Sequence, residues 1–214
     1  MPAHTADSGR SPVKPWPSLW VWAALLALLT LGFAIDAPAL ALVEPFRRSA
    51  TAEMIRQVVR PLGTGHVQIP VALLMLLAGA LWSRRLKRTG GWTLLAFAVS
   101  GAIANVIKVL VHQRRPFSVE PPPESWLGYL HNSKFQSFPS AETATTFAVA
   151  LTISAAYPAL RTPLVAIAGI VGVARVFVGS HHPSDVVAGA MLGIAVGQSL
   201  GRHARRRETE PGGR

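Results

Sequence analysis

The sequence predicts an all-α protein, a polytopic membrane bundle of six transmembrane helices with a short extracytoplasmic helix between the first two. Three observations support this fold class. Half of the 214 residues are hydrophobic and only 14% are charged, whereas soluble domains carry about a quarter charged residues. The hydrophobic residues form long blocks, as helices that cross the hydrocarbon core require. Several of the six Trp residues stand at block edges, where interfacial anchors occur.

Six apolar blocks are the candidate spans. The first has an uncharged centre, and Lys108 and Arg175 lie near the ends of the third and the fifth. The second, fourth, fifth and sixth are short and contain Gly or Ala, which favours helices packed on one another. In chain order the spans are residues 19–43, 67–82, 92–111, 141–157, 163–178 and 186–200.

The connecting segments are polar or broken by proline. Residues 44–65 carry an apolar helical stripe, which predicts a short helix on the membrane surface or against the bundle. The stripe consists of Met54, Ile55, Val58, Val59 and Leu62. The outer loop 116–139 contains the run Glu-Pro-Pro-Pro-Glu at 120–124, which cannot be helix interior.

The length of the chain suits one domain. We expect a single six-span domain over residues 19–201, between a cytoplasmic tail at 1–18 and a basic cytoplasmic tail at 202–214. The polar composition of 1–15 and 203–214 predicts disorder there.

Basic residues orient the spans. With the N-terminus inside, more than half of the 21 Lys and Arg residues fall on cytoplasmic segments, most densely in the tight loop 83–91 and the C-terminal tail. This predicts an integral plasma (inner) membrane protein with both termini in the cytoplasm. A cleavable signal peptide is the alternative for the first block, since Ala39-Leu40-Ala41 follows an apolar run. That run is longer than a usual signal core, which favours a retained span.

Five cations crowd the outer ends of spans three to five, on the side that the positive-inside rule disfavours. They are Lys108, Arg114, Arg115, Lys134 and Arg175. An anionic ligand explains them. Nucleic acid is not the expected partner despite the net charge of +11, because the basic residues mostly flank apolar blocks.

Three short strings on this side carry chemistry. In the first, Lys108 and Arg115 are seven residues apart, two helical turns, so both should point the same way before Pro116 ends the helix. In the second, Ser140, Ala141 and Glu142 open the fourth span, and a helix N-terminus suits an anion.

The third string places His181 six residues after Arg175 and four before Asp185. At that spacing the pair can meet on one helix face. The Asp then fixes the imidazole tautomer and leaves the other nitrogen free to attack. Singly, these residues have plain structural explanations, such as snorkelling cations, an N-cap serine or a structural His–Asp bond. Their coincidence at the ends of three spans favours a functional site.

Together the strings resemble the signature of the type 2 phosphatidic acid phosphatase superfamily of membrane lipid phosphatases and vanadium haloperoxidases. Its pattern is Lys-x6-Arg-Pro, Pro-Ser-Gly-His and Ser-Arg-x5-His-x3-Asp, and the resemblance covers about residues 66–200. It implies a metal-independent phosphoric monoester or diphosphate hydrolase, without a cofactor, that forms a phosphohistidine. His181 would be the nucleophile and Asp185 its orienter. The phosphate-binding residues would be Lys108, Arg115, Ser140, Ala141 and Arg175.

The sequence departs from that pattern at three positions. Ala174 replaces Ser, Ala141 replaces Gly, and Glu142 replaces the His that serves the family as general acid. A carboxyl group can take this role only when protonated, which burial favours and neighbouring cations oppose. Substitutes for the acid that we rank lower are His112, His131 and His182.

A site level with the headgroups suits an amphiphilic substrate: a phospholipid, lipid A or a polyprenyl phosphate, reached from the surrounding membrane lipids. A non-catalytic lipid-phosphate binder and a phosphoryl transferase between lipids are the alternatives. Transport is less favoured, because the ionisable residues sit near one face. The oligomeric state cannot be derived from the sequence.

Overall fold

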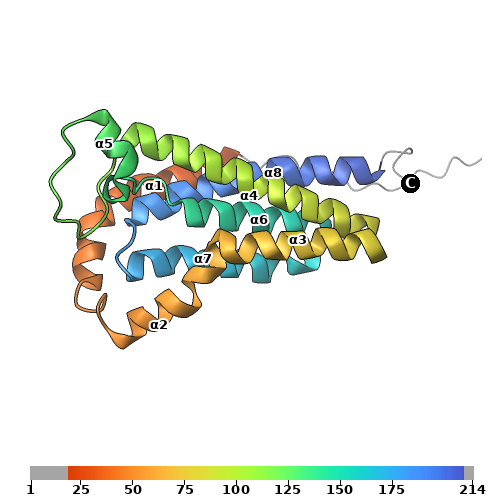
Figure 1. Cartoon of the computed structure of the whole chain (residues 1–214), viewed down its shortest axis with the longest axis horizontal. Coiled ribbons are helices and arrows are strands. Elements are labelled where there is room, and N and C mark those ends of the chain that lie inside the picture. Colours follow the sequence, from red (N-terminus) through yellow and green to blue (C-terminus); the bar gives the residue numbers. More distant parts are fainter. Residues whose placement is uncertain (1–18, 210–214) are drawn as a thin grey trace, which may run out of the picture.

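The computed structural model describes residues 19–209, and these form helices and connecting loops without any strand. Figure 1 shows an elongated bundle whose long helices run along one axis, with α2 and α5 at the end opposite the C-terminus. In chain order the elements are α1 (Leu19–Val43), α2 (Ala50–Val58), the 3₁₀ helix η1 (Arg60–Gly63), α3 (Gly65–Trp82), α4 (Arg84–Val111), α5 (Trp126–His131), η2 (Ser133–Phe135), α6 (Ala141–Ala156), η3 (Pro158–Leu160), α7 (Arg161–Phe177) and α8 (Pro183–Thr209).

Within the described part, five helical segments are long and apolar enough to cross a membrane: α1, α3, α4, η3 with α7, and most of α8. This confirms the prediction of an all-helical protein with several membrane spans. The block predicted as the fourth of six spans forms α6, which has only 16 residues and is shorter than the usual spanning length. The count of six therefore stays a prediction.

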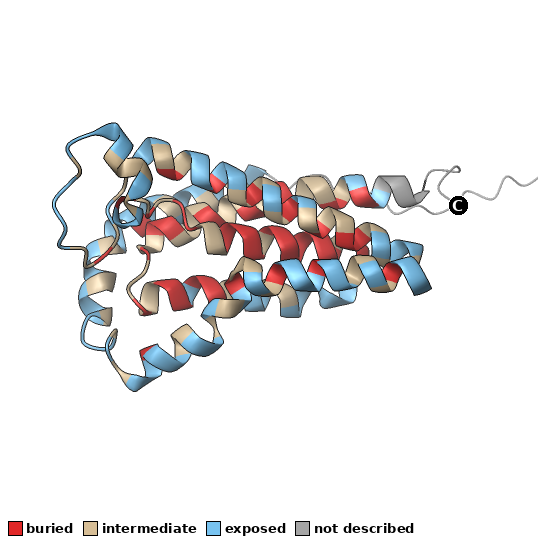
Figure 2. Cartoon of the chain, viewed as in Figure 1, coloured by how far each residue is buried: buried red, intermediate tan, exposed pale blue. Residues whose placement is uncertain are grey.

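Helix α6 is the centre of the bundle. Most of its side chains are buried, including every residue from Ala148 to Ser154, whereas α1 and α3 bury one and three residues. Figure 2 shows this as a buried central helix with exposed outer faces around it. An aqueous protein would not expose so many Leu and Val side chains, so these outer faces suit lipid.

A row of glycines on α8 brings this helix close to α6. A Cβ added to Gly189 would lie 2.5 Å from the carbonyl oxygen of Ser140, and one added to Gly193 would collide with the carbonyl oxygen of Ala144. Small residues at such spacing let helix backbones approach closely in membranes. This packing holds the beginning of α8 against the beginning of α6, where two of the three strings lie.

Helices α3 and α4 form a tight antiparallel pair. The predicted loop at 83–91 is wrong, because α4 already begins at Arg84. Ser83 alone makes the turn, and its hydroxyl accepts a hydrogen bond from the backbone N–H of Leu86 at 3.4 Å. Gly79 and Gly90 permit the close contact, since a Cβ on either would meet the backbone of the facing helix.

The segment between α1 and α3 contains α2 and η1, so a short helix forms there. The predicted apolar stripe is largely uncovered by the bundle, with Met54 59% and Val58 63% exposed. At the C-terminus, α8 continues to Thr209, so the expected disorder is wrong for 203–209. The predicted tail 1–18 and residues 210–214 lie outside the described residues.

Candidate active site

The side chain of Asp185, in the first turn of α8, caps the N-terminus of that helix. Oδ2 of Asp185 accepts a hydrogen bond from the backbone N–H of His182 at 2.8 Å, in the manner of a capping box. The same oxygen accepts the hydroxyl of Ser137 at 2.5 Å and lies 3.2 Å from Nδ1 of His182. Asp185 is fully buried, so its carboxylate is fixed by these contacts.

His181 lies beside this carboxylate, with Nδ1 3.3 Å from Oδ2 of Asp185. The pair meets as predicted, but the reason differs, because His181 belongs to the loop before α8 and does not share a helix with Asp185. Burial lowers the pKa of His181 from 6.5 to about 4, although its hydrogen bond to Asp185 opposes the shift. The imidazole is therefore neutral at pH 7.

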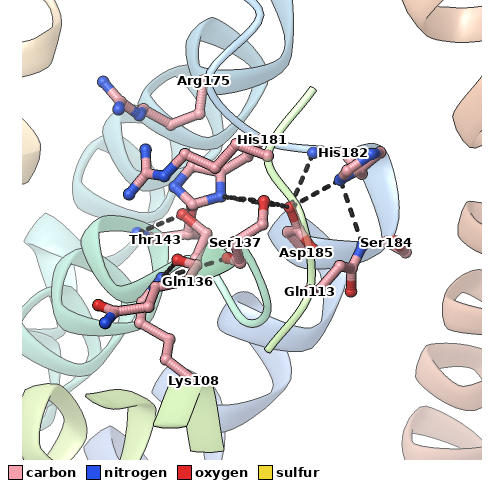
Figure 3. A network of polar contacts seen from close by, with 12 residues as sticks. Lys108, Gln113, Gln136, Ser137, Thr143, Arg175, His181, His182, Ser184 and Asp185 are labelled. Atoms are coloured by element: carbon pink, nitrogen blue, oxygen red, sulfur yellow. Dashed lines mark hydrogen bonds and ion pairs between the residues drawn. The ribbon is translucent and has the colours of Figure 1, made fainter. Parts of the chain in front are cut away.

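Figure 3 shows Lys108 and Arg175 on the opposite side of the His181 ring from Asp185. Lys108 is buried and donates to the carbonyl oxygens of Gln136 and Ser137, at 2.6 and 3.2 Å. These bonds keep its ammonium group in place beside the imidazole.

Arg115 reaches the same region from a loop. Helix α4 ends at Val111 because His112 adopts a left-handed conformation with φ 52°, so the prediction that it continues to Pro116 is wrong. The backbone N–H of Arg115 bonds to the carbonyl oxygen of Lys134 at 2.7 Å, and Nε to that of Ser133 at 2.9 Å. Burial lowers the pKa of Arg115, but a guanidinium stays charged.

Arg175 is almost fully buried and faces a carboxylate. Its Nε lies 3.1 Å from Oε2 of Glu142, and Nε of Arg60 lies 4.0 Å from the other oxygen. Glu142 thus occupies the place beside Arg175 that an anionic ligand would take.

The beginning of α6 completes the site. Ser140 caps the helix, with its hydroxyl accepting from the backbone N–H of Thr143 at 3.4 Å. Its own backbone N–H bonds to the carbonyl oxygen of Asp185 at 2.9 Å, which ties α6 to α8. We call the surrounding group the anion cradle; it consists of Lys108, Arg115, Arg175, Ser140 and Ala141.

Other sequence candidates point elsewhere. Arg114 lies over the ring of Phe135 and donates to the carbonyl oxygen of Glu120. His131 is exposed and contacts its own helix, and the ring of His112 packs on Tyr129. His182 contacts Asp185, but Figure 3 shows it on the far side of that carboxylate from His181.

The structure also adds residues that the motifs do not contain. Ser137 joins both His181 and Asp185, Gln113 contacts His182 at 3.2 Å, and Arg60 faces Glu142. Asp36 bonds Ser184 at the start of α8. Only Asp36 had a visible signal, as a lone carboxyl group inside an apolar block.

The fold and the site define a helical, multi-pass membrane protein with a buried histidine–carboxylate pair beside buried cations, an arrangement suited to binding a phosphate. Over residues 19–209 no cluster of His, Cys, Asp and Glu side chains could hold a metal ion. The chain belongs to the PAP2 superfamily, whose family model matches residues 89–207.

Curated relatives agree with this membership. A lipid A 1-phosphatase of Rhizobium johnstonii is 32% identical over 112 residues, which are 49% of this chain and 43% of the relative. A lipid A 1-phosphatase of Rhizobium etli is 26% identical over 202 residues, 85% of this chain and 82% of the relative. The chain thus spans less than half of the first relative and most of the second.

A solved structure supports the fold. A transmembrane PAP2-type phosphatidylglycerolphosphate phosphatase from Bacillus subtilis has a TM-score of 0.69 and 18% sequence identity, covering 90% of this chain and 97% of that one. The family and its named phosphatase relatives support the expected enzyme class, a lipid phosphatase in a multi-pass membrane protein.

Proposed function

We propose that this protein hydrolyses a lipid phosphate or diphosphate at the outer face of the plasma membrane, with His181 as covalent nucleophile. The observation that carries the proposal is the setting of His181. Its ring is buried and neutral, Nδ1 faces Asp185, and Lys108 and Arg175 lie across the ring. A nucleophile, an orienting carboxylate and fixed cations are the parts that phosphoryl transfer needs.

In the proposed reaction the anion cradle binds the phosphoryl oxygens and neutralises the charge that builds in the transition state. Nε2 of His181 attacks phosphorus, and the bond to the leaving oxygen breaks. Water then attacks the phosphohistidine, the N–P bond breaks, and inorganic phosphate leaves. Asp185 holds the Nδ1 proton and stabilises the positive charge on the ring.

Glu142 is the proposed proton donor to the leaving oxygen, in place of the family's histidine. Its two oxygens face Arg175 and Arg60, so its carboxyl group lies beside the anion cradle. A phosphate held by the cradle would bring its leaving oxygen to this carboxyl group.

The proposed topology has six spans, with α6 as the fourth, and both termini in the cytoplasm. The turn between α3 and α4 lies near the C-terminal end of α8, at the far end of the bundle from α5 (Figure 1). Because basic residues gather at that far end, the site faces the periplasm or outside.

The proposed substrate is an amphiphile whose tail stays in the bilayer. The names of the two relatives favour lipid A, while phosphatidylglycerol phosphate, phosphatidic acid and polyprenyl phosphates offer the same chemistry. Transfer of the phosphoryl group to a lipid hydroxyl and binding without turnover are the alternatives. The pairing of Glu142 with Arg175 and Arg60 specifically favours binding without turnover.

The test is phosphate release from a panel of these lipid phosphates by the purified protein in detergent. His181→Ala should lose several orders of magnitude of activity, because the covalent step is then impossible. His203→Ala is the matched control, since this exposed histidine contacts only its own helix and Trp92. If His181→Ala kept a tenth of the activity, the phosphohistidine mechanism would be wrong. Binding of lipid phosphate without release by the wild type would establish the binder instead.

A further inference from the structure

We infer that a cavity beside the anion cradle binds the apolar part of the substrate next to its phosphate, an inference that rests on the proposed function. The cavity has a volume of about 420 Å³ and lies between the start of α3, the outer half of α4 and the first turn of α6. Its lining includes Gly65, Phe97, Ala102, Asn105 and Glu142. This volume is in the range of small-molecule sites, about 300–1,000 Å³.

The cavity and the cradle share part of their walls. Ala141 and Glu142 line the cavity, while Ala141 offers the N-terminus of α6 and Glu142 faces Arg175. A phosphate held by the cradle would therefore place its ester substituent at the cavity mouth. Because the cavity is continuous with the anion cradle, its occupant is the apolar part of the same lipid phosphate that the cradle binds.

Small residues keep the space open. Gly65 and Phe97 both line the cavity, and a Cβ on Gly65 would lie 3.1 Å from Cζ of Phe97. On the α4 side, Ala98 and Ala102 present no more than a methyl group. Larger side chains at these positions would occupy the volume or displace its walls.

The opening faces sideways. Ala98, Ala102 and Asn105 are exposed and follow one another at helical spacing on α4, which is a membrane-spanning candidate. Such a face of a spanning helix meets the hydrocarbon region rather than water. An alkyl or prenyl chain can thus enter from the bilayer, and a water-soluble headgroup cannot.

The test uses butyl, hexyl and octyl phosphate as inhibitors of 4-nitrophenyl phosphate turnover. In the wild type the inhibition constant should fall by roughly 15-fold for each added pair of methylene groups, because each buried methylene is worth roughly fourfold. Ala102→Phe should remove most of this chain-length gain and leave inhibition by inorganic phosphate unchanged. Ile103→Phe is the matched control, since Ile103 is the exposed neighbour outside the cavity.

Each result decides the matter. An unchanged chain-length dependence in Ala102→Phe would overturn the cavity assignment, as would the same loss in Ile103→Phe. Equal weakening of octyl phosphate and inorganic phosphate would also overturn it, because the substitution would then have disturbed the cradle. Failure of the proposed function is recognised separately, by turnover that survives in His181→Ala.

We further infer, from a different observation, that Asp36 of α1 is a positioning residue for the active site. Its two carboxylate oxygens accept hydrogen bonds from the backbone N–H of Ser184 at 2.9 Å and from the hydroxyl of Ser184 at 2.6 Å. Gly32 makes room for this contact, because a Cβ there would lie 3.1 Å from Cα of Ser184.

The contact between Asp36 and Ser184 affects His181 and Asp185 through the backbone at the start of α8. Ser184 is fully buried and immediately precedes Asp185, the residue that faces His181. A carboxylate at a helix N-terminus satisfies free N–H groups and is stabilised by the helix dipole. Asp36 thereby anchors the first turn of α8, and the first helix becomes part of the site, which opposes its removal as a signal peptide.

The test compares Asp36→Ala with Asp36→Asn. Loss of the anchor should lower kcat by about 10- to 100-fold, since a displacement of 1 Å can cost about 10²-fold, with KM changed less than twofold. Asp36→Asn keeps one oxygen for the Ser184 N–H and should retain most activity. Thr30→Val is the control, because Thr30 bonds only to Leu26 of its own helix.

A kcat of Asp36→Ala within twofold of the wild type would overturn the positioning role. A loss in Asp36→Asn as large as that in Asp36→Ala would overturn the anchoring by an acceptor oxygen. If Asp36→Ala does not fold, Asp36→Asn and Asp36→Ser provide the same kcat comparison. A general destabilisation would lower the active fraction and with it the apparent kcat, so kcat is calculated per folded protein, quantified for each variant from its unfolding transition in detergent.

Discussion

Replacing Glu142 by glutamine should slow the hydrolysis of alkyl phosphates by about 10²–10⁴-fold, the range for loss of a general acid. An aryl phosphate should be almost unaffected, because its leaving oxygen departs without a proton. The contrast between the two substrates isolates proton donation from phosphate binding, which both substrates share.

The position of Glu142 explains the expected size of this effect. Its oxygens lie 3.1 Å from Nε of Arg175 and 4.0 Å from Nε of Arg60, and the residue also lines the cavity beside the anion cradle. A proton delivered there to the leaving oxygen acts only in the transition state. The expected loss of 10²–10⁴-fold corresponds to about 3–5 kcal/mol of transition-state stabilisation.

The assay measures kcat for octyl phosphate and 4-nitrophenyl phosphate with the wild type, Glu142→Gln and Glu142→His. The histidine variant should recover octyl phosphate turnover, since imidazolium is a competent acid near neutral pH. Glu53→Gln is the matched control, because Glu53 is exposed and pairs with Arg56 on α2. Equal loss on both substrates, or none on either, would refute the acid role and favour the lipid-phosphate binder.

Three further predictions concern pH, packing and topology. Because burial lowers the pKa of His181 to about 4, the imidazole of this proposed nucleophile stays mostly neutral above that pH. Turnover at saturating aryl phosphate should persist to about pH 5, and an acid limb near 6.5 would contradict the burial. The histidine of the unfolded chain takes up a proton near pH 6.5, whereas buried His181 does so only near pH 4. The free energy of unfolding should therefore decrease as the pH is lowered from 6.5 to 4. Gly193→Ala should lower the free energy of unfolding by about 1–3 kcal/mol, since its Cβ meets the backbone of α6. Gly169→Ala, with nothing within 4 Å of its Cβ, should leave thermal unfolding in detergent unchanged or slightly raised. An impermeant thiol reagent should label Ser125→Cys in intact cells; labelling only after membrane disruption would reverse the topology.

The sequence by itself determined the class of fold and the inventory of the candidate site. Apolar blocks need helices in a bilayer, because no water is there to satisfy the backbone. The block at 19–43 therefore became α1 with those bounds. The spacings around Lys108, Arg175 and Asp185 likewise identified side chains that the structure brings together. The sequence was sufficient to identify these residues because proline, serine and charged side chains have strong positional preferences at helix ends.

Tertiary structure alone decided how those side chains meet. His181 reaches Asp185 from a loop, and Arg115 reaches the cradle after α4 has already ended at Val111. Neither follows from a helical repeat. The partners Ser137 and Asp36 lie 48 and 148 residues away from the α8 residues that they bond. No spacing along the chain encodes such contacts, because they arise only when glycine-lined helices pack closely enough for buried polar groups to find one another.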